Sequence, residues 1–229
     1  MDKVSVIIAA AGSASRMNGV PKQLALLRGK PVIAYSMEVF QRIDEISEII
    51  VAAKKEHSDT IRQTAEKYGI TKLTAVTEGG ATRQSSVINA LKCVSKETSL
   101  IAVHDAARPL VSEEYVRSCI HDASVFGGAT LGVPVRDTIK VADDGFVTDT
   151  PDRSRLYIIQ TPQIFIKKYY FAGVNFALDH ELDFTDDCQL AEAVGTKIHI
   201  TVSDYKNIKL TTPEDIDIAE AILGKSDTP

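Results

Sequence analysis

The chain has 229 residues, of which 44% are hydrophobic and 25% are charged, and its formal net charge is −5. This length suits one large α/β domain, the composition is that of an ordinary folded enzyme, and the negative charge argues against a nucleic-acid partner bound through its phosphates. No stretch reaches the roughly 20 apolar residues of a membrane span and no signal peptide precedes the first apolar run, so we expect a cytoplasmic protein without a membrane partner.

Short apolar runs alternate with amphipathic stretches along most of the chain. The runs that predict strands are VSVIIAA, EIIVAA, KLTAV, SLIAV and ATLGVPV. Strands that are apolar on both faces and separated by helices indicate a mostly parallel sheet covered on both sides. The predicted fold class is therefore α/β, a single Rossmann-like domain with helices on both faces of its sheet.

Local signals predict several helix boundaries. Pro31 suits a first helical position, Ser112 suits an N-cap, and Gly69 suits the position just after a helix. Near the end of the chain, TPED at residues 212–215 opens a last helix that Gly224 is expected to close.

The alternation fails once, between about residues 136 and 156. There, short β-like pieces flank an Asp-Asp-Gly turn and no helical period is present, which predicts a projecting β-hairpin arm. Because so few apolar residues cannot form a core alone, we expect the arm to reach another subunit or to cover a site. The predicted organisation is one domain over residues 1–229 with an arm at about 136–156.

The three cysteines are widely spaced and form no metal or redox motif. We therefore expect Cys93, Cys119 and Cys188 to be buried thiols.

Ligands of open parallel sheets bind beyond the carboxyl ends of the strands, so the loops that follow the predicted strands are where chemistry is expected. The first loop, AAAGSASRMNGVPK, matches neither a Walker A motif nor GxGxxG. Its small residues can turn backbone amides toward an anion, and Arg16 and Lys22 are cations suited to phosphate oxygens. A solvated loop with two surface cations explains the same residues equally well.

The loops after the third and fourth predicted strands add further polar groups. EGGATRQSS supplies two glycines, Arg83 and two hydroxyls at the start of a helix, which suits either a pocket wall or a capped turn. In HDAARP, Asp105 ends an apolar strand and is a candidate Mg²⁺ ligand beside substrate phosphates. The alternative is an ion pair between Asp105 and Arg108 that shapes a turn. We expect His104 to pack or hydrogen-bond structurally.

Later segments concentrate more polar side chains. Arg153 and Thr161 lie in TPDRSRLYIIQTPQ, and FTDDC opens a predicted helix with Thr185 as its N-cap. We interpret the two aspartates after Thr185 as a response to the helix dipole. In NIKLT, which ends the last β-like run, Lys209 is the candidate and the nearby Lys206 is expected to be solvated. Many cations, one well-placed carboxylate and no nucleophile with a base indicate phosphoryl or nucleotidyl transfer.

Six segments taken in order resemble one known family: AAAGSASRMNGVPKQ, AVHDAARP, PVRDTIK, TPDRSRLY, QTPQIF and NIKLTTPED. They resemble the 2-C-methyl-D-erythritol 4-phosphate cytidylyltransferases of bacterial and plastid isoprenoid synthesis, from residue 4 to about residue 220. The resemblance implies a nucleotidyltransferase that joins CTP to methylerythritol phosphate, a sugar-alcohol phosphate, and releases pyrophosphate, with Mg²⁺ on the triphosphate.

The resemblance also implies roles for individual residues. Those expected to line the nucleotide are Ala10, Ala11, Gly12, Gly80, Arg83 and Ser86. The catalytic cations would be Arg16 and Lys22 on the triphosphate and Arg153 and Lys209 on the acceptor phosphate. Those around the sugar alcohol and the metal would be Asp105, Arg108, Thr138, Thr161 and Thr185, with Asp105 as the metal ligand. In this family the arm is exchanged across a homodimer, so Thr138 and Arg153 would serve the partner's site.

Two other functions remain open at this point. A ribitol-5-phosphate cytidylyltransferase would share the cations, although AAG in the first loop and AARP after the fourth strand favour methylerythritol phosphate. A non-catalytic nucleotide-binding module would have lost some of the four cations, which are all present. The chain departs from the family pattern at Ala14, where many members have a second glycine, and at Ala81, where some have an acid.

Overall fold

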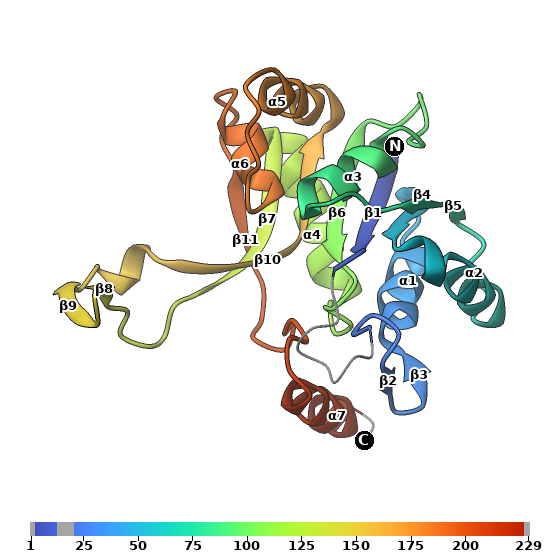
Figure 1. Cartoon of the computed structure of the whole chain (residues 1–229), viewed down its shortest axis with the longest axis horizontal. Coiled ribbons are helices and arrows are strands. Elements are labelled where there is room, and N and C mark those ends of the chain that lie inside the picture. Colours follow the sequence, from blue (N-terminus) through green and yellow to red (C-terminus); the bar gives the residue numbers. More distant parts are fainter. Residues whose placement is uncertain (1–2, 13–20, 227–229) are drawn as a thin grey trace.

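A seven-stranded sheet forms the centre of the protein (Figure 1). The computed structural model describes residues 3–12 and 21–226. The sheet order is β11-β7-β10-β6-β1-β4-β5. Its strands are β1 (Val4–Ala10), β4 (Ile46–Ala53), β5 (Leu73–Glu78), β6 (Leu100–Asp105), β7 (Gly128–Pro134), β10 (Tyr157–Ile166) and β11 (His199–Val202). Only β10 runs antiparallel to its neighbours in this sheet, so the predicted α/β class with a mostly parallel sheet is confirmed.

Helices cover both faces of the sheet. One face is covered by α1 (Val32–Arg42), α2 (Ser58–Lys67) and α4 (Glu113–Phe126), and the other by α3 (Arg83–Leu91), α5 (Lys167–Asp179) and α6 (Asp187–Glu192). Val6 and Ile8 of β1 belong to the first core and Ile7 belongs to the second. Both faces of the strand are therefore buried, which explains why it reads as an unbroken apolar run.

A third, smaller apolar cluster joins the last helix to the segment that follows the first loop. Here α7 (Glu214–Ser226) packs against the short ribbon of β2 (Leu26–Leu27) and β3 (Lys30–Pro31). Leu27, Leu210 and Ala219 are buried in the cluster, and the Leu210 N–H donates to the Ala107 carbonyl at 2.8 Å. These contacts fix the loop that carries Lys209 beside the end of β6.

The predicted helix boundaries agree with the structure in part. Ser112 caps α4 by accepting from the Tyr115 N–H, and Gly69 follows α2 with a positive φ of 66°. Pro31 is the N-cap of α1 rather than its first helical residue. Gly224 does not end the last helix, because α7 continues through it to Ser226.

The predicted arm extends away from the sheet (Figure 1). It contains the antiparallel hairpin of β8 (Val141–Asp143) and β9 (Phe146–Asp149), followed by the short helix η2 (Arg153–Arg155). Asp144 and Gly145 connect the strands with φ values of 49° and 84°, the two positive values that a tight hairpin turn requires. Residues 136–150 are all exposed in the single chain.

Two predictions from composition can also be compared with the structure. Cys119 and Cys188 are buried, but Cys93 is exposed, because it lies in the turn after α3 rather than on a face that packs against the sheet. In the described part of the chain, the helices are too short or too polar to cross a membrane.

Candidate active site

Two adjoining pockets open at the carboxyl ends of the parallel strands. The first, of about 380 Å³, has a lining that includes Ala10, Ala11, Gly12, Lys22, Lys54, Gly80 and Ser86. The second, of about 480 Å³, has a lining that includes Arg108, Gln160, Thr161, Gln163, Thr185, Asp186 and Cys188. Arg83, Asp105 and Lys209 line both pockets, so ligands in the two pockets would meet at these three residues.

Two glycines after β5 allow close contacts beside the first pocket, Gly79 with the loop after β1 and Gly80 with the start of α3. A Cβ atom on Gly79 would lie 2.3 Å from the Ala11 Cβ, and one on Gly80 would lie 2.2 Å from the Ser85 Oγ. Glycine is therefore required at both positions. The Gly80 N–H donates to the Ser86 Oγ at 3.0 Å, so these two predicted nucleotide-binding residues form one wall.

Besides Arg83 and Lys209, the first pocket is lined by the cations Lys22 and Lys54. Lys22 lines it, as predicted, whereas Arg16 and its neighbour Ala14 lie outside the described residues. Lys54 also lines the pocket and was missed. It directly follows β4, and the expectation that ligands bind beyond the carboxyl ends of strands applies to β4 as it does to β1 and β6.

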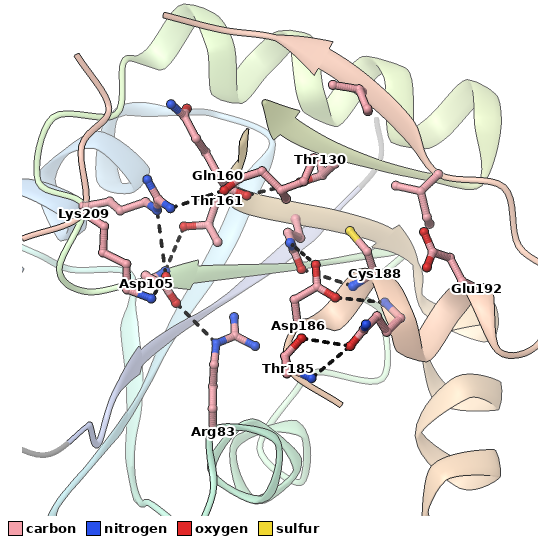
Figure 2. A pocket seen from close by; sticks show the side chains of 16 residues that line it. Arg83, Asp105, Thr130, Gln160, Thr161, Thr185, Asp186, Cys188, Glu192 and Lys209 are labelled. Carbon is pink, nitrogen blue, oxygen red and sulfur yellow. Dashed lines mark hydrogen bonds and ion pairs between the residues drawn. The ribbon is translucent and has the colours of Figure 1, made fainter. Parts of the chain in front are cut away.

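Asp105, at the border of the two pockets, is surrounded by cations (Figure 2). Its Oδ2 lies 2.7 Å from the Lys209 Nζ and 3.8 Å from the Arg108 Nε. Its Oδ1 accepts from the Arg83 Nε at 3.3 Å. Burial would raise the pKa of Asp105, but the charges of Lys209, Arg83 and Arg108 outweigh it and hold that pKa well below its usual range. Asp105 is therefore an ionised carboxylate with cations at both oxygens.

This arrangement does not suit a metal ion held by protein side chains. Mg²⁺ prefers hard oxygen ligands, and both oxygens of Asp105 already contact cations. Among the described residues, no group of three or more His, Cys, Asp or Glu side chains could hold a metal. The metal role of Asp105 stays a prediction, and an ion here would depend on oxygens that the substrate brings.

Buried hydrogen bonds fix Thr161 in the wall of the second pocket. Its Oγ accepts from the Asp105 N–H at 3.0 Å and lies 3.1 Å from the His104 Nδ1. The other ring nitrogen of His104, Nε2, lies 3.2 Å from the Arg108 carbonyl, which can only accept. Burial lowers the pKa of His104 to about 4. The neutral ring therefore donates from Nε2 and accepts the Thr161 hydroxyl at Nδ1, a structural role like the one predicted.

Arg108 and Thr185 also lie in the second pocket. The Arg108 Nη1 donates to the Asn207 carbonyl at 2.8 Å, so its predicted pairing with Asp105 is one of several contacts. The Thr185 hydroxyl donates to the side chain of Gln189 at 3.0 Å. The prediction that Thr185 is the N-cap of α6 is wrong. The helix begins one residue later than expected, and Asp186 is the N-cap, because its carboxylate accepts the Gln189 N–H.

Thr138 and Arg153 lie on the arm and line neither pocket of their own chain. Both are exposed, and the Arg153 Nη1 donates to the Arg136 carbonyl at 2.9 Å. Among the described residues, the structure thus brings Lys22, Lys209, Asp105 and the other predicted residues outside the arm to the two pockets, but not Thr138 and Arg153.

The helix-dipole interpretation of Asp187 is incomplete. Asp187 is the first residue of α6, as a helix-dipole interpretation requires, but it is 1% exposed and accepts from the Arg83 Nη1 at 2.6 Å. Gln163, also missed, accepts the N–H groups of Asp187 and Cys188. The local sequence cannot distinguish an acid that only interacts favourably with the helix dipole from one that also pairs with an arginine more than a hundred residues away.

Comparison with known proteins gives a consistent result over almost the whole chain. The family model described as 2-C-methyl-D-erythritol 4-phosphate cytidylyltransferase matches residues 4–225. A relative of that name from Caldanaerobacter subterraneus subsp. tengcongensis is 44% identical, over 97% of this chain and 99% of the relative. One from Clostridium botulinum, of the same name, is 38% identical, over 98% of this chain and 99% of the relative.

Solved structures agree with the sequence relatives. The 4-diphosphocytidyl-2C-methyl-D-erythritol synthase of Anaerococcus prevotii superposes with a TM-score of 0.86 at 33% identity, covering 97% of this chain and 96% of that one. The 2-C-methyl-D-erythritol 4-phosphate cytidylyltransferase of Thermus thermophilus superposes with a TM-score of 0.79 at 29% identity, covering 96% and 98%. With its two-pocket site on this fold, the chain belongs to the 2-C-methyl-D-erythritol 4-phosphate cytidylyltransferase family.

Proposed function

We infer that this chain is a nucleotidyltransferase that joins the cytidylyl group of CTP to 2-C-methyl-D-erythritol 4-phosphate and releases pyrophosphate, in isoprenoid precursor synthesis. Family membership over residues 4–225 supports this inference. The observation that carries it is the wall of Arg83, Asp105 and Lys209 shared by the two pockets. A nucleotide in the first pocket and an acceptor phosphate in the second would meet at that wall, as transfer between them requires.

The cations explain how two anionic reactants can approach. An acceptor phosphate that attacks a triphosphate is repelled by several negative charges, and fixed cations reduce this repulsion while orienting the reactants. We propose that Lys22 and Arg16 neutralise the triphosphate and that Lys209, held by Asp105, binds the acceptor phosphate. No general base is needed, because a phosphate monoester with a second pKa of about 6 is largely ionised at neutral pH.

We propose that a divalent cation, Mg²⁺ in the simplest case, accompanies CTP. Since both oxygens of Asp105 contact cations, phosphate oxygens rather than protein side chains would supply most of its ligands.

We further propose that two copies of the chain form the working enzyme. The arm exposes apolar side chains that a partner would cover, with Phe146 78% and Val147 60% exposed. Arg153 and Thr138, which line neither pocket of their own chain, would then complete the partner's second pocket. We propose the cytoplasm as the location, because both substrates are highly charged and do not cross membranes unaided.

Pyrophosphate release from CTP and Mg²⁺ tests the function, with methylerythritol phosphate and ribitol 5-phosphate as acceptors in parallel. We expect kcat/KM to be higher with methylerythritol phosphate by at least about tenfold, the discrimination that a fitted pocket gives. Release with neither acceptor would contradict the enzyme assignment, and faster release with ribitol 5-phosphate would reassign the substrate.

A further inference from the structure

We propose that Asp187, supported by Tyr170, is a positioning residue that holds the guanidinium of Arg83 at the border between the nucleotide pocket and the acceptor pocket. The inference rests on the function proposed above, and it concerns a residue that does not line either pocket.

The buried Asp187 is held by hydrogen bonds with three other residues, Tyr170, Arg83 and Gln163. Its Oδ1 accepts from the hydroxyl of the fully buried Tyr170 at 2.5 Å, and its Oδ2 accepts from the Arg83 Nη1 at 2.6 Å. Its N–H donates to the Gln163 side chain at 2.9 Å, which ties the start of α6 to β10. The carboxylate therefore has little freedom to move.

The protonation states of Arg83 and Tyr170 suit this role. Burial alone would lower the pKa of Arg83, but the charges of Asp187 and Asp105 raise it above its usual value. Burial and the charge of Asp187 raise the pKa of Tyr170 well above its usual value. Arg83 is therefore a cation and Tyr170 a hydrogen-bond donor at any ordinary assay pH.

Arg83 bridges two carboxylates unequally. Its contact with Asp187 is 2.6 Å, whereas its Nε lies 3.3 Å from Asp105, on which Lys209 also converges at 2.7 Å. The shorter contact is with the more deeply buried acid, so Asp187 determines where the guanidinium lies. The Arg83 Nη2 has no hydrogen-bond partner among residues 3–12 and 21–226, so it is available to a ligand in the pockets that Arg83 lines.

Loss of the Asp187 charge would redirect Arg83. Within the described structure, the remaining carboxylate in contact with Arg83 is Asp105. The guanidinium would move toward Asp105 and compete with Lys209 for it. Because Arg83 and Lys209 line both pockets, nucleotide binding and acceptor positioning would be disturbed together.

The test is a double-mutant cycle on the full-length protein, using Asp187→Asn, Arg83→Gln and the double variant. We expect Asp187→Asn to lower kcat/KM for CTP by about tenfold or more, and the double variant to lie within about twofold of Arg83→Gln, because Asp187 acts through Arg83. Asp187→Glu, which keeps the charge, should recover part of the loss. Effects of Asp187→Asn and Arg83→Gln that multiply would contradict the proposal.

Glu48→Gln is the matched control, because Glu48 is another buried carboxylate, at the amino end of β4 and away from both pockets. It accepts from the Ser5 hydroxyl at 2.5 Å and from the Ser95 N–H at 2.8 Å. We expect Glu48→Gln to lower the thermal midpoint without changing kcat/KM for CTP. An equal loss of kcat/KM in the two variants would mean that Asp187 matters only for stability.

Two further measurements keep the outcomes separate. If Asp187→Asn does not fold, Tyr170→Phe replaces it; a severalfold loss of kcat/KM for CTP is expected, and no loss would overturn the proposal. Isothermal titration calorimetry measures the affinity for CTP of the wild type and of Asp187→Asn when no acceptor is present and no turnover occurs. A wild-type chain that binds CTP but releases no pyrophosphate contradicts the proposed function, whereas unchanged CTP affinity and unchanged kcat/KM in Asp187→Asn contradict the positioning role.

Discussion

At the scale of single residues, the surroundings of a side chain distinguish groups that look alike in the sequence. Lys206 and Lys209 lie on the same loop, three positions apart. Lys209 is 2.7 Å from the buried Asp105 and lines both pockets, whereas Lys206 is exposed. The ion pair with Asp105 holds Lys209 at the border of the two pockets, where we propose that the acceptor phosphate binds.

We expect Lys209→Ala to lower kcat by about 100-fold, the usual cost of removing one preorganised charge from the reacting groups. Lys206→Ala is the control and should stay within about twofold of the wild type, since its charge is solvated. Steady-state rates of pyrophosphate release measure both. Similar losses in the two variants would remove the specific role of Lys209.

We expect the titration of His104 to make the stability of the folded chain, rather than its catalytic activity, depend on pH. Its pKa is about 4 in the folded chain, because of burial, and about 6.5 in an unfolded chain. Between these values the unfolded chain binds the additional proton, so the free energy of unfolding is highest above pH 6.5 and decreases as the pH falls toward 4, by up to about 1.4 kcal/mol per pH unit.

Urea titrations of the wild type and of His104→Gln between pH 7 and pH 4.5 measure this effect. The slope of unfolding free energy against pH should be shallower in His104→Gln. Equal slopes would show that His104 is not held neutral in the folded chain.

How far the site could be predicted depends on the range of each contact. Asp105 and Arg108 are three residues apart at the end of one strand, so the sequence could suggest their pairing. The contact of Asp187 with Arg83 joins residues 104 positions apart, and an acid at a helix start has a sufficient local explanation. Only the tertiary structure shows that Asp187, besides lying in the first turn of α6, pairs with Arg83.

At the scale of elements, the same distinction between local and distant causes holds. Strands β1, β4, β6 and β7 could be predicted because almost all of their residues are buried and each reads as an apolar run. The antiparallel direction of β10 could not, because it depends on where the chain re-enters the sheet after the arm. The residues of β10 do not show on which side or in which direction the chain returns to the sheet after the arm.

The contact between the loops after β1 and β5 is an element-scale feature that can be tested. A Cβ on Gly79 would lie 2.3 Å from the Ala11 Cβ, so Gly79→Ala must push the two loops apart. We expect the KM for CTP to rise by about tenfold, because a misplacement of about 1 Å is costly in an ordered site. Steady-state kinetics with thermal unfolding as the stability control test this, and an unchanged KM would show that the loops do not shape the nucleotide pocket.

At the scale of the whole molecule, the proposed dimer makes each site depend on two chains. A Lys209→Ala chain and an Arg153→Ala chain would then complement each other, because a mixed dimer contains one site with both residues intact. After co-expression in equal amounts we expect about one quarter of wild-type activity, since half of randomly formed dimers are mixed. Activity no higher than that of the separate variants would place Arg153 outside the partner's site.

The central claim is that an oxygen of the acceptor phosphate, held beside the shared wall of Arg83, Asp105 and Lys209, forms the new bond to the α-phosphorus that comes from CTP. Methylerythritol phosphate labelled with ¹⁸O at its non-bridging phosphate oxygens tests this claim most directly. We predict that mass spectrometry and ³¹P NMR will find all of the label in the diphosphate-linked cytidine product and none in pyrophosphate. Label in pyrophosphate, or pyrophosphate release without a labelled cytidine product, would contradict the account.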